Sequence, residues 1–279
     1  MNFKGRKLVI ATMHNKEKAM APILEKRLGV QCCLEKKLDT DQFGTFSGEI
    51  ERSKSPLEVL RAKCLAAMEL SGCDIAIASE GSFGNHPLLF FSQANDELVM
   101  FLDRKNNIEI VERELSLSTN LAGRYIHSLE ELDEFAEKVL FPSHALIVKD
   151  KESDFSFLEK GIQSIEKLQW AFNTCWEKHA SVYVETDMRA MYNPTRMKNI
   201  ALATSKLCDK IASCCPRCYF PGFSVEQVVP GLPCSSCRFP TKSTKAILYK
   251  CKKCSFEEKH NFPHKKYEED PTYCDICNP

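Results

Sequence analysis

Long apolar runs are missing from this 279-residue chain, and its charges cancel, because 38 basic residues stand against 38 acidic ones. Without about 20 consecutive apolar residues, no segment is expected to span a bilayer. The balanced charge argues against a protein that coats nucleic acid or an anionic membrane with its whole surface. The N-terminal stretch carries charges throughout and has no continuous apolar core, so we expect no signal peptide.

Cysteine, in contrast, is abundant, with 15 copies in the chain. Eight of these form four C-x2-C pairs near the C-terminus, namely Cys215/Cys218, Cys234/Cys237, Cys251/Cys254 and Cys274/Cys277. Each pair can direct two thiolates at one ion, and a tetrahedral zinc ion takes two pairs. The spacing therefore predicts two structural Zn²⁺ sites. Four thiolates fill each coordination sphere, so we expect no catalysis there.

The pairing of the four C-x2-C units is less constrained than their number. We pair them in sequence order, 215/218 with 234/237 and 251/254 with 274/277, and the interleaved pairing stays open. Four disulfides are the alternative, but nothing indicates an oxidising compartment, and the seven other cysteines are scattered as in a reduced protein. The expected location is the cytoplasm.

Hydrophobic periodicity predicts a mixed α/β domain over residues 1–213 and a zinc ribbon over residues 214–279. The expected opening is strand, helix, strand, helix, strand over residues 7–12, 15–29, 30–35, 56–72 and 74–79. Ser55-Pro56-Leu57-Glu58 predicts the start of the second helix, because it joins a capping box to a proline in the first turn.

The rest of the large domain is expected to complete a mixed sheet with flanking helices. An antiparallel meander is predicted at residues 86–92, 97–103 and 108–116. A helix should follow Ser128, a strand should occupy residues 144–149, and apolar residues recur at helical intervals from Leu158 to Trp176. A strand at residues 181–186 and a helix opening at Pro194 complete the prediction.

Three segments of the large domain carry side chains suited to a ligand site. After the first strand come His14, Asn15, Lys16 and Lys18, where a helix N-terminus attracts anions. At the expected end of a buried strand lie Glu80, Ser82, Asn85 and His86. Before the last helix lie Glu185, Asp187, Arg189, Asn193 and Arg196, and arginines beside a helix N-terminus suit phosphate. Asp39, Asp41 and Glu49 could complete a divalent-cation site.

The ribbon contains a candidate nucleic-acid contact between Arg238 and Phe256. This stretch holds six basic residues, no acidic residue and three aromatic rings, a composition that fits a strand tracking phosphates with stacking side chains. The ribbon as a whole carries ten basic and seven acidic residues, and zinc-bound thiolates would add negative charge. A solvated lysine face or a protein-docking surface therefore remains the alternative.

The sequence resembles an uncharacterised bacterial family defined by a domain of unknown function. The motifs that carry the resemblance are TMHNKE, DTDQFGTFSGEIER, ASEGSFGNHP, DMRAMYNPTRM and YCDICNP. The first 100 residues are also similar to the house-cleaning nucleoside triphosphate pyrophosphatases of the inosine triphosphatase and Maf group. That similarity implies triphosphate contacts at Asn15, Lys16 or Lys18, magnesium at Glu80, and Arg196 near the base or phosphates.

Two functional hypotheses follow. The first is a magnesium-dependent hydrolase of a nucleotide-like phosphate, in which Glu80, with Asp39 or Asp187, holds the cation while Lys16 and Arg196 neutralise developing charge. The second is a binding module without turnover, in which the α/β domain recognises a nucleotide and the ribbon docks nucleic acid or a protein.

Overall fold

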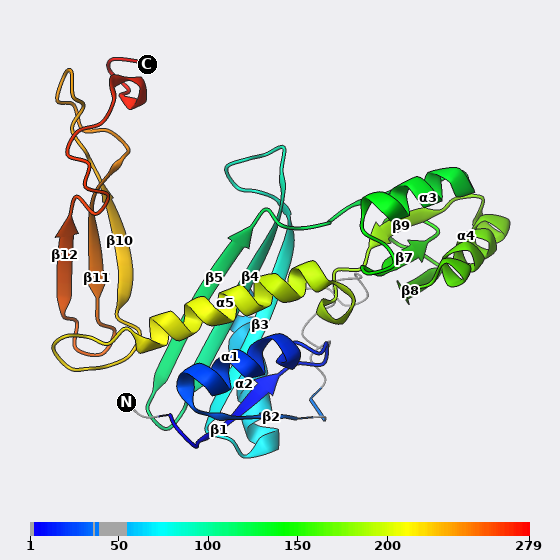
Figure 1. Ribbon diagram of the computed structural model, residues 1–279, viewed down its shortest axis with the longest axis horizontal. Coiled ribbons are helices and arrows are strands. Elements are labelled where there is room, and N and C mark those ends of the chain that lie inside the picture. Colours follow the sequence, from blue (N-terminus) through cyan, green and yellow to red (C-terminus); the bar gives the residue numbers. More distant parts are fainter. Residues whose placement is uncertain (1–2, 36, 39–54) are drawn as a thin grey trace. The chain divides into compact units, whose positions relative to one another are not determined.

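The computed structural model describes residues 3–35, 37–38 and 55–279 (Figure 1). The chain divides into two compact units, residues 3–207 and residues 208–279. The first is a mixed α/β unit and the second is a small β-ribbon, so the predicted fold class is confirmed. Asp39, Asp41 and Glu49 lie outside the described residues.

A five-stranded sheet in the order β2-β1-β3-β4-β5 forms the centre of the α/β unit. Its strands are β1 (Lys7–Ala11), β2 (Gln31–Leu34), β3 (Ile75–Asn85), β4 (Gln93–Asp103) and β5 (Ile108–Ser116). β1 pairs in parallel with both β2 and β3, whereas β3, β4 and β5 form an antiparallel meander. The parallel half is where the carboxyl ends of strands meet helix N-termini.

Helices cover both faces of this sheet. α2 (Pro56–Ser71) begins with the predicted capping box, in which the Ser55 hydroxyl accepts from the backbone N–H of Glu58. Leu60, Cys64 and Ala67 of α2 are buried against alternate residues of β1 and β3. On the other face, α1 (Glu17–Leu28) contacts α5 (Pro194–Ala212) through Arg27, whose Nη1 donates to the Ser205 carbonyl at 3.0 Å.

β3 does not end where the sequence led us to expect. It continues through Asn85 and pairs along its whole length with β4, so Glu80, Ser82 and Asn85 are spread along one strand. Five residues of strand span roughly 16 Å, and successive side chains point to opposite faces. The predicted strand at residues 86–92 is instead the hairpin loop between β3 and β4. The candidate residues of this motif therefore do not converge on one crevice.

A second sheet completes the α/β unit, with the order β6-β9-β7-β8. Its elements are β6 (Gly123–Tyr125), α3 (Leu129–Lys138), β7 (Leu146–Lys149), β8 (Leu158–Ile162), α4 (Ile165–His179) and β9 (Tyr183–Thr186). The helices pack Phe135, Leu168 and Phe172 on this sheet in a core of its own. The helix-like spacing from Leu158 was misleading, because residues 158–162 form an edge strand and α4 begins at Ile165.

The unit of residues 208–279 contains a three-stranded antiparallel sheet in the order β10-β11-β12. β10 (Ser224–Pro230), β11 (Thr244–Lys250) and β12 (Glu257–Asn261) are followed by the short 3₁₀ helix η3 (Pro271–Tyr273). Its small core consists of cysteines with Phe223, Tyr249 and Phe256. Among the helices that the structure describes, none has the length and apolar character needed to cross a membrane.

Candidate functional site

The eight paired cysteines form two quartets. One contains Cys215, Cys218, Cys251 and Cys254, and the other contains Cys234, Cys237, Cys274 and Cys277. Within each quartet the Sγ atoms all lie within 4.8 Å of one another, and four Sγ–Sγ contacts between the pairs run from 3.6 to 3.9 Å. Four converging thiols match the ligand set of a tetrahedral structural zinc site.

The pairing is interleaved, so our pairing in sequence order was wrong. The reason is the antiparallel sheet. β10 leads away from the first C-x2-C pair to the second, and β11 returns to place the third beside the first. β12 then runs antiparallel to β11 and carries the chain toward the fourth pair, which joins the second. One quartet therefore lies at each end of the ribbon.

Each of the first three C-x2-C turns has the same backbone geometry. The residue after the second cysteine has a positive φ: 57° at Tyr219, 64° at Arg238 and 56° at Ser255. In each turn that residue's N–H donates to the carbonyl of the first cysteine at 2.9 to 3.0 Å. These repeated turns point both thiols of a pair the same way, which is what a shared ion requires.

Three of the six basic residues from Arg238 to Phe256 form ion pairs within the ribbon. Arg238 forms an ion pair with Glu268, Lys242 pairs with Asp275 at 3.1 Å, and Lys250 pairs with Glu257 at 2.7 Å. The Lys253 ammonium lies 5.3 Å from the centre of the Phe220 ring. Half of the segment's positive charges are thus matched by an acid within the ribbon.

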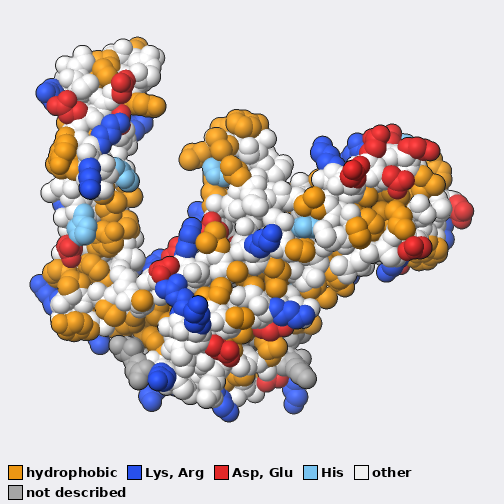
Figure 2. Space-filling view, viewed as in Figure 1, with side chains coloured by type: hydrophobic (Ala, Val, Ile, Leu, Met, Phe, Trp, Pro, Cys, Tyr) orange, Lys and Arg blue, Asp and Glu red, His pale blue; other side chains and the backbone are white. Residues whose placement is uncertain are grey.

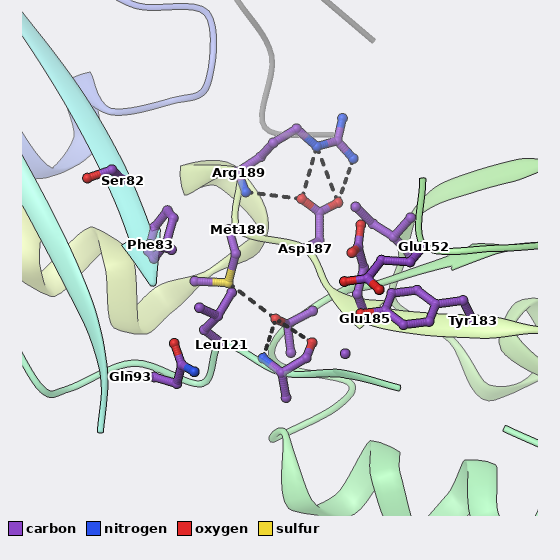
Figure 3. Close-up of a pocket in the computed structure, with 14 residues that line it drawn as sticks. Ser82, Phe83, Gln93, Leu121, Glu152, Tyr183, Glu185, Asp187, Met188 and Arg189 are labelled. Atoms are coloured by element: carbon purple, nitrogen blue, oxygen red, sulfur yellow. Dashed lines mark hydrogen bonds and ion pairs between the residues drawn. The ribbon is translucent and has the colours of Figure 1, made fainter. Parts of the chain in front are cut away.

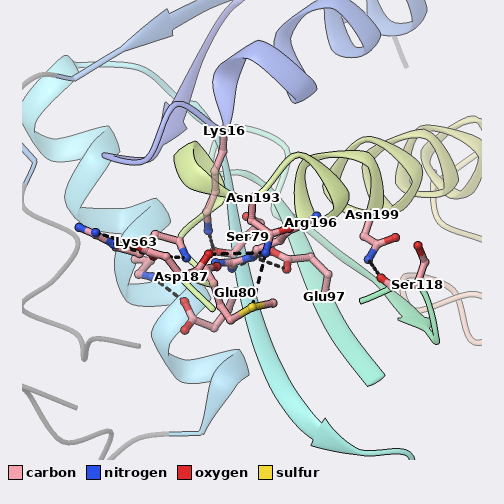
Figure 4. Close-up of polar contacts among 12 residues, drawn as sticks. Lys16, Lys63, Ser79, Glu80, Glu97, Ser118, Asp187, Asn193, Arg196 and Asn199 are labelled. Carbon is pink, nitrogen blue, oxygen red and sulfur yellow. Dashed lines mark hydrogen bonds and ion pairs between the residues drawn. The ribbon is translucent and has the colours of Figure 1, made fainter. Parts of the chain in front are cut away.

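A cluster of buried charges lies around the middle of β3 in the α/β unit (Figure 4). On the α2 face, Lys63 Nζ contacts Glu80 Oε2 at 2.6 Å, and each side chain is 8% exposed. On the α5 face, Arg196 Nε contacts Glu97 Oε2 at 3.2 Å, and both side chains are fully buried. Two ion pairs from separate helices thus flank the same strand.

Lys16 is the third buried cation of this cluster. It immediately precedes α1, and its Nζ donates to the Ser79 carbonyl at 3.0 Å. Among the described residues, no carboxylate lies within ion-pair distance of it. Burial, and after it the nearby Arg196 guanidinium, lowers the pKa of Lys16 to about 7. The ammonium form of Lys16 is therefore disfavoured in the folded protein unless negative charge is supplied.

The α5 face of β3 and β4 also contains unsatisfied polar atoms. Ser79 Oγ and both polar atoms of the Asn95 side chain are buried, and they find no partner among the described residues. The register places Asn95 opposite Phe83 and Glu97 opposite Gly81, so these side chains share the face on which Arg196 lies. Buried groups of this kind normally bind water or a ligand.

Gly81 makes room for the Arg196–Glu97 pair. A Cβ atom at this position would lie 2.5 Å from Glu97 Oε2 and 2.6 Å from Arg196 Nη2. Arg196 also donates to the Met188 carbonyl at 2.7 Å and lies 5.3 Å from the centre of the Phe83 ring. The Arg196 guanidinium thus links the five-stranded sheet to the segment before α5. A phosphate that contacts Arg196 would compete with its bonds to Glu97 and to the Met188 carbonyl.

A cavity of about 580 Å³ lies between the β3–β4 strands and the second sheet (Figure 3). Ser82, Phe83, Asp187, Met188 and Arg189 contribute to its wall. Asp187 and Arg189 face one another as a local ion pair, with Nη2 and Oδ2 at 2.6 Å. The predicted residues Ser82, Asp187 and Arg189 are therefore brought together here.

The far wall of the cavity is acidic and aromatic. Glu185 contacts Lys149 Nζ at 2.7 Å, and burial raises the pKa of its carboxyl group. Tyr183 lines the same wall, and burial raises the pKa of its hydroxyl to about 12. The cavity thus offers rings and hydrogen-bonding groups on facing sides, as a small polar ligand requires.

The other predicted residues lie elsewhere. His86 Nδ1 accepts from the backbone N–H groups of Leu88 and Leu89 at 3.2 and 3.1 Å, so it holds the hairpin loop in shape. Asn85 Oδ1 accepts from Gln93. Asn193 caps the start of α5 by accepting from the Arg196 N–H. His14, Asn15 and Lys18 lie in or just after the loop that follows β1, and Asn15 has a φ of 57°.

Magnesium at Glu80 does not fit the described residues. The Glu80 carboxylate already contacts the Lys63 ammonium, and the groups able to offer three metal ligands in the described part of the chain are the two cysteine quartets. The expected partner Asp187 is held by Arg189. We therefore assign no step to a metal ion in this unit.

Sequence reasoning missed Lys63, Glu97 and Asn95, although signals for them existed. Lys63 follows Leu60 by three positions and so lies on the buried stripe of α2, where a charge needs a partner. Asn95 and Glu97 are in phase with buried Val99 and Phe101 along β4. Polar residues in phase with a buried strand face are candidates for a buried polar site.

The comparison with known families gives one result. A family model described as Domain of unknown function (DUF6671) matches residues 63–279, which is more than half of the chain. The chain belongs to this family. The DUF6671 match includes Lys63, Glu80, Arg196 and both cysteine quartets, whereas Lys16 precedes it. No curated protein matches the sequence.

Proposed function

We propose that the α/β unit binds a phosphate-bearing, nucleotide-like ligand where the β1–α1 loop meets β3. The observation that carries this proposal is Lys16, a buried amine beside a helix N-terminus that has no carboxylate partner among the described residues. Lys63 and Arg196 each have a glutamate, so Lys16 is the surplus cation of the cluster.

An anion at this position would remove the cost of burying that charge. An ion moved into a protein interior is unfavourable by several kcal/mol unless an opposite charge compensates it. The positive end of the helix dipole at the N-terminus of α1 favours an anion in the same place. Bound phosphate would therefore raise the pKa of Lys16 and restore its ammonium form.

The neighbouring cavity suits the remainder of such a ligand. Phe83 lines the cavity and also lies against Arg196, so the cavity and the charge cluster share this ring. Tyr183 and Glu185 could contact the base or sugar by stacking and hydrogen bonding. A nucleotide would then place its phosphates toward Lys16 and its base between the two sheets.

We further propose that the α/β unit hydrolyses the phosphate ligand that it binds. Lys16, once protonated by ligand binding, would neutralise charge that develops on the departing oxygen. The alternative is a module that binds and does not turn over its ligand. Release of phosphate or pyrophosphate separates the two, because a module that only binds leaves the nucleoside triphosphate intact.

The test is a thermal-shift screen of zinc-loaded protein with nucleoside mono-, di- and triphosphates, with and without magnesium. We expect one nucleotide class to raise the melting temperature, and Lys16→Met to abolish the rise. Lys18→Met is the matched control, because Lys18 is exposed on the same helix and should leave the rise intact. A rise unchanged in Lys16→Met, or no rise with any nucleotide, would refute the proposal.

A further inference from the structure

Cys33 and Cys73 bring two thiols into contact although 40 residues separate them. Cys33 lies in β2 and Cys73 in the segment between α2 and β3, and their Sγ atoms are 3.6 Å apart. They belong to neither cysteine quartet. This contact involves Cys33, the second of the two adjacent cysteines 32 and 33.

The two adjacent cysteines point to opposite sides of β2. The Cys32 thiol lies 4.0 Å from the Ala21 carbonyl of α1, whereas the Cys33 thiol lies 3.5 Å from the Leu8 carbonyl and faces Cys73. Alternation along a strand prevents both from reaching the same partner. Cys32 is therefore a built-in control for any chemistry of the Cys33–Cys73 pair.

Cys33 is half-buried, and Cys73 beside it is buried with 9% of its surface exposed. They line a surface cavity of about 380 Å³ together with Cys32, Lys7 and Glu35. β2 is an edge strand of four residues, and Cys73 follows Gly72, which ends α2 with a φ of 70°. A disulfide needs an S–S distance of about 2.05 Å, so the sulfurs must approach by roughly 1.5 Å. Segments at the edge of a sheet and after a helix end can make such a shift.

We propose that Cys33 and Cys73 are a modification site that forms a reversible disulfide with a peroxide oxidant. The Cys33 thiolate attacks one oxygen of hydrogen peroxide, the O–O bond breaks, and hydroxide leaves to give a sulfenic acid. The Cys73 sulfur then attacks the sulfenic sulfur and displaces its oxygen, which takes a proton and leaves as water. Overall, two thiols are oxidised to one disulfide, and one peroxide is reduced to two waters.

The environment makes formation of this cross-link slow. Burial, followed by the hydrogen bond with Cys73, raises the pKa of Cys33 to about 11, so little thiolate exists at neutral pH. The rate should rise roughly tenfold per pH unit below that pKa. Once formed, the bond would join the edge strand to the start of β3 and close the chain between the two cysteines. This inference is independent of the proposed phosphate site.

The experiment treats the zinc-loaded, full-length protein with hydrogen peroxide at pH 7.5 and at pH 9, followed by peptide mapping without reduction. We expect a linked Cys33–Cys73 peptide, 2 Da lighter than its reduced parts, that forms faster at pH 9 and disappears with a thiol reductant. The oxidised protein should melt about 5 °C higher. Cys32→Ser should keep the link.

Two variants test the inference, and a linked peptide that persists in either of them would overturn it. Cys33→Ser and Cys73→Ser should each remove the linked peptide, and Cys33 is half-buried, so its variant should fold even if that of Cys73 does not. A link through Cys32, or oxidation of the zinc-site cysteines with no Cys33–Cys73 peptide at either pH, would contradict the proposal.

Discussion

At the residue scale, Lys16 lies where a charged ammonium is unfavourable. Its pKa falls from 10.5 to about 7 on folding, because burial removes water and Arg196 is close. Between these two values the unfolded chain holds a proton that the folded protein has released, so the stability that depends on Lys16 rises with pH. Below pH 7 the folded protein bears the full free-energy cost of burying the charged Lys16 ammonium.

Substitution of Lys16 by methionine should therefore stabilise the ligand-free protein in a pH-dependent way. We expect Lys16→Met to raise the free energy of unfolding by a few kcal/mol at pH 6.5, and the difference from the wild type to shrink toward zero near pH 10. Urea titrations of both proteins across this range measure it. A difference that stays constant with pH would show that Lys16 titrates normally.

Gly81 provides a steric test of the buried Arg196–Glu97 pair. A Cβ at position 81 would overlap Glu97 and Arg196, whereas a Cβ at position 84 would meet nothing within 4 Å. We expect Gly81→Ala to lower the free energy of unfolding by about 1–3 kcal/mol, and Gly84→Ala, on the same strand, to leave it within about 0.5 kcal/mol. Equal effects in urea denaturation would contradict the close packing at Gly81.

At the element scale, the β3–β4 hairpin presents an apolar tip to solvent. Leu88, Phe90 and Phe91 are 79%, 77% and 90% exposed, and Figure 2 shows the apolar side chains gathered at this end of the hairpin. His86 fixes the loop through its backbone bonds. The apolar run at residues 86–92, which we expected to form a strand, is therefore an ordered hairpin loop that packs no face against the core.

Because the tip contributes little to the core, its rings can be replaced without loss of stability. We expect the double variant Phe90→Ser, Phe91→Ser to unfold within about 0.5 kcal/mol of the wild type and to bind less of an apolar dye. Phe101→Ala, at a fully buried position, should cost about 3–5 kcal/mol. A large loss of stability in the tip variant would show that Phe90 and Phe91 pack against the fold.

Double cysteine variants can show which C-x2-C pairs bind the same zinc ion. Cys218→Ser with Cys251→Ser removes two ligands from one quartet, whereas Cys218→Ser with Cys237→Ser removes one ligand from each. The interleaved pairing predicts that the first double variant retains one zinc ion per chain and that the second loses affinity at both sites. Zinc analysis after dialysis against a competing chelator measures both. Pairing in sequence order predicts the opposite result.

At the scale of the whole molecule, the sequence predicted the elements that local chemistry determines. The C-x2-C spacing, the Ser55 capping box and the β1–α1–β2 order were all read correctly because each depends on neighbours in the chain. The sequence did not predict which residues far apart in the chain contact one another. The partners Lys63–Glu80 and Arg196–Glu97 come from separate helices and strands, and the interleaved cysteine quartets follow from strand directions.

The most direct test of the account is an NMR titration of the lysine side chains with ¹³C-labelled Cε, with and without inorganic triphosphate. The signal missing from Lys16→Met identifies Lys16. We predict a pKa near 7 for this amine in the free protein and a clear increase when triphosphate binds. A Lys16 that titrates near its ordinary pKa, or one whose pKa does not change with triphosphate, would contradict the proposed phosphate site.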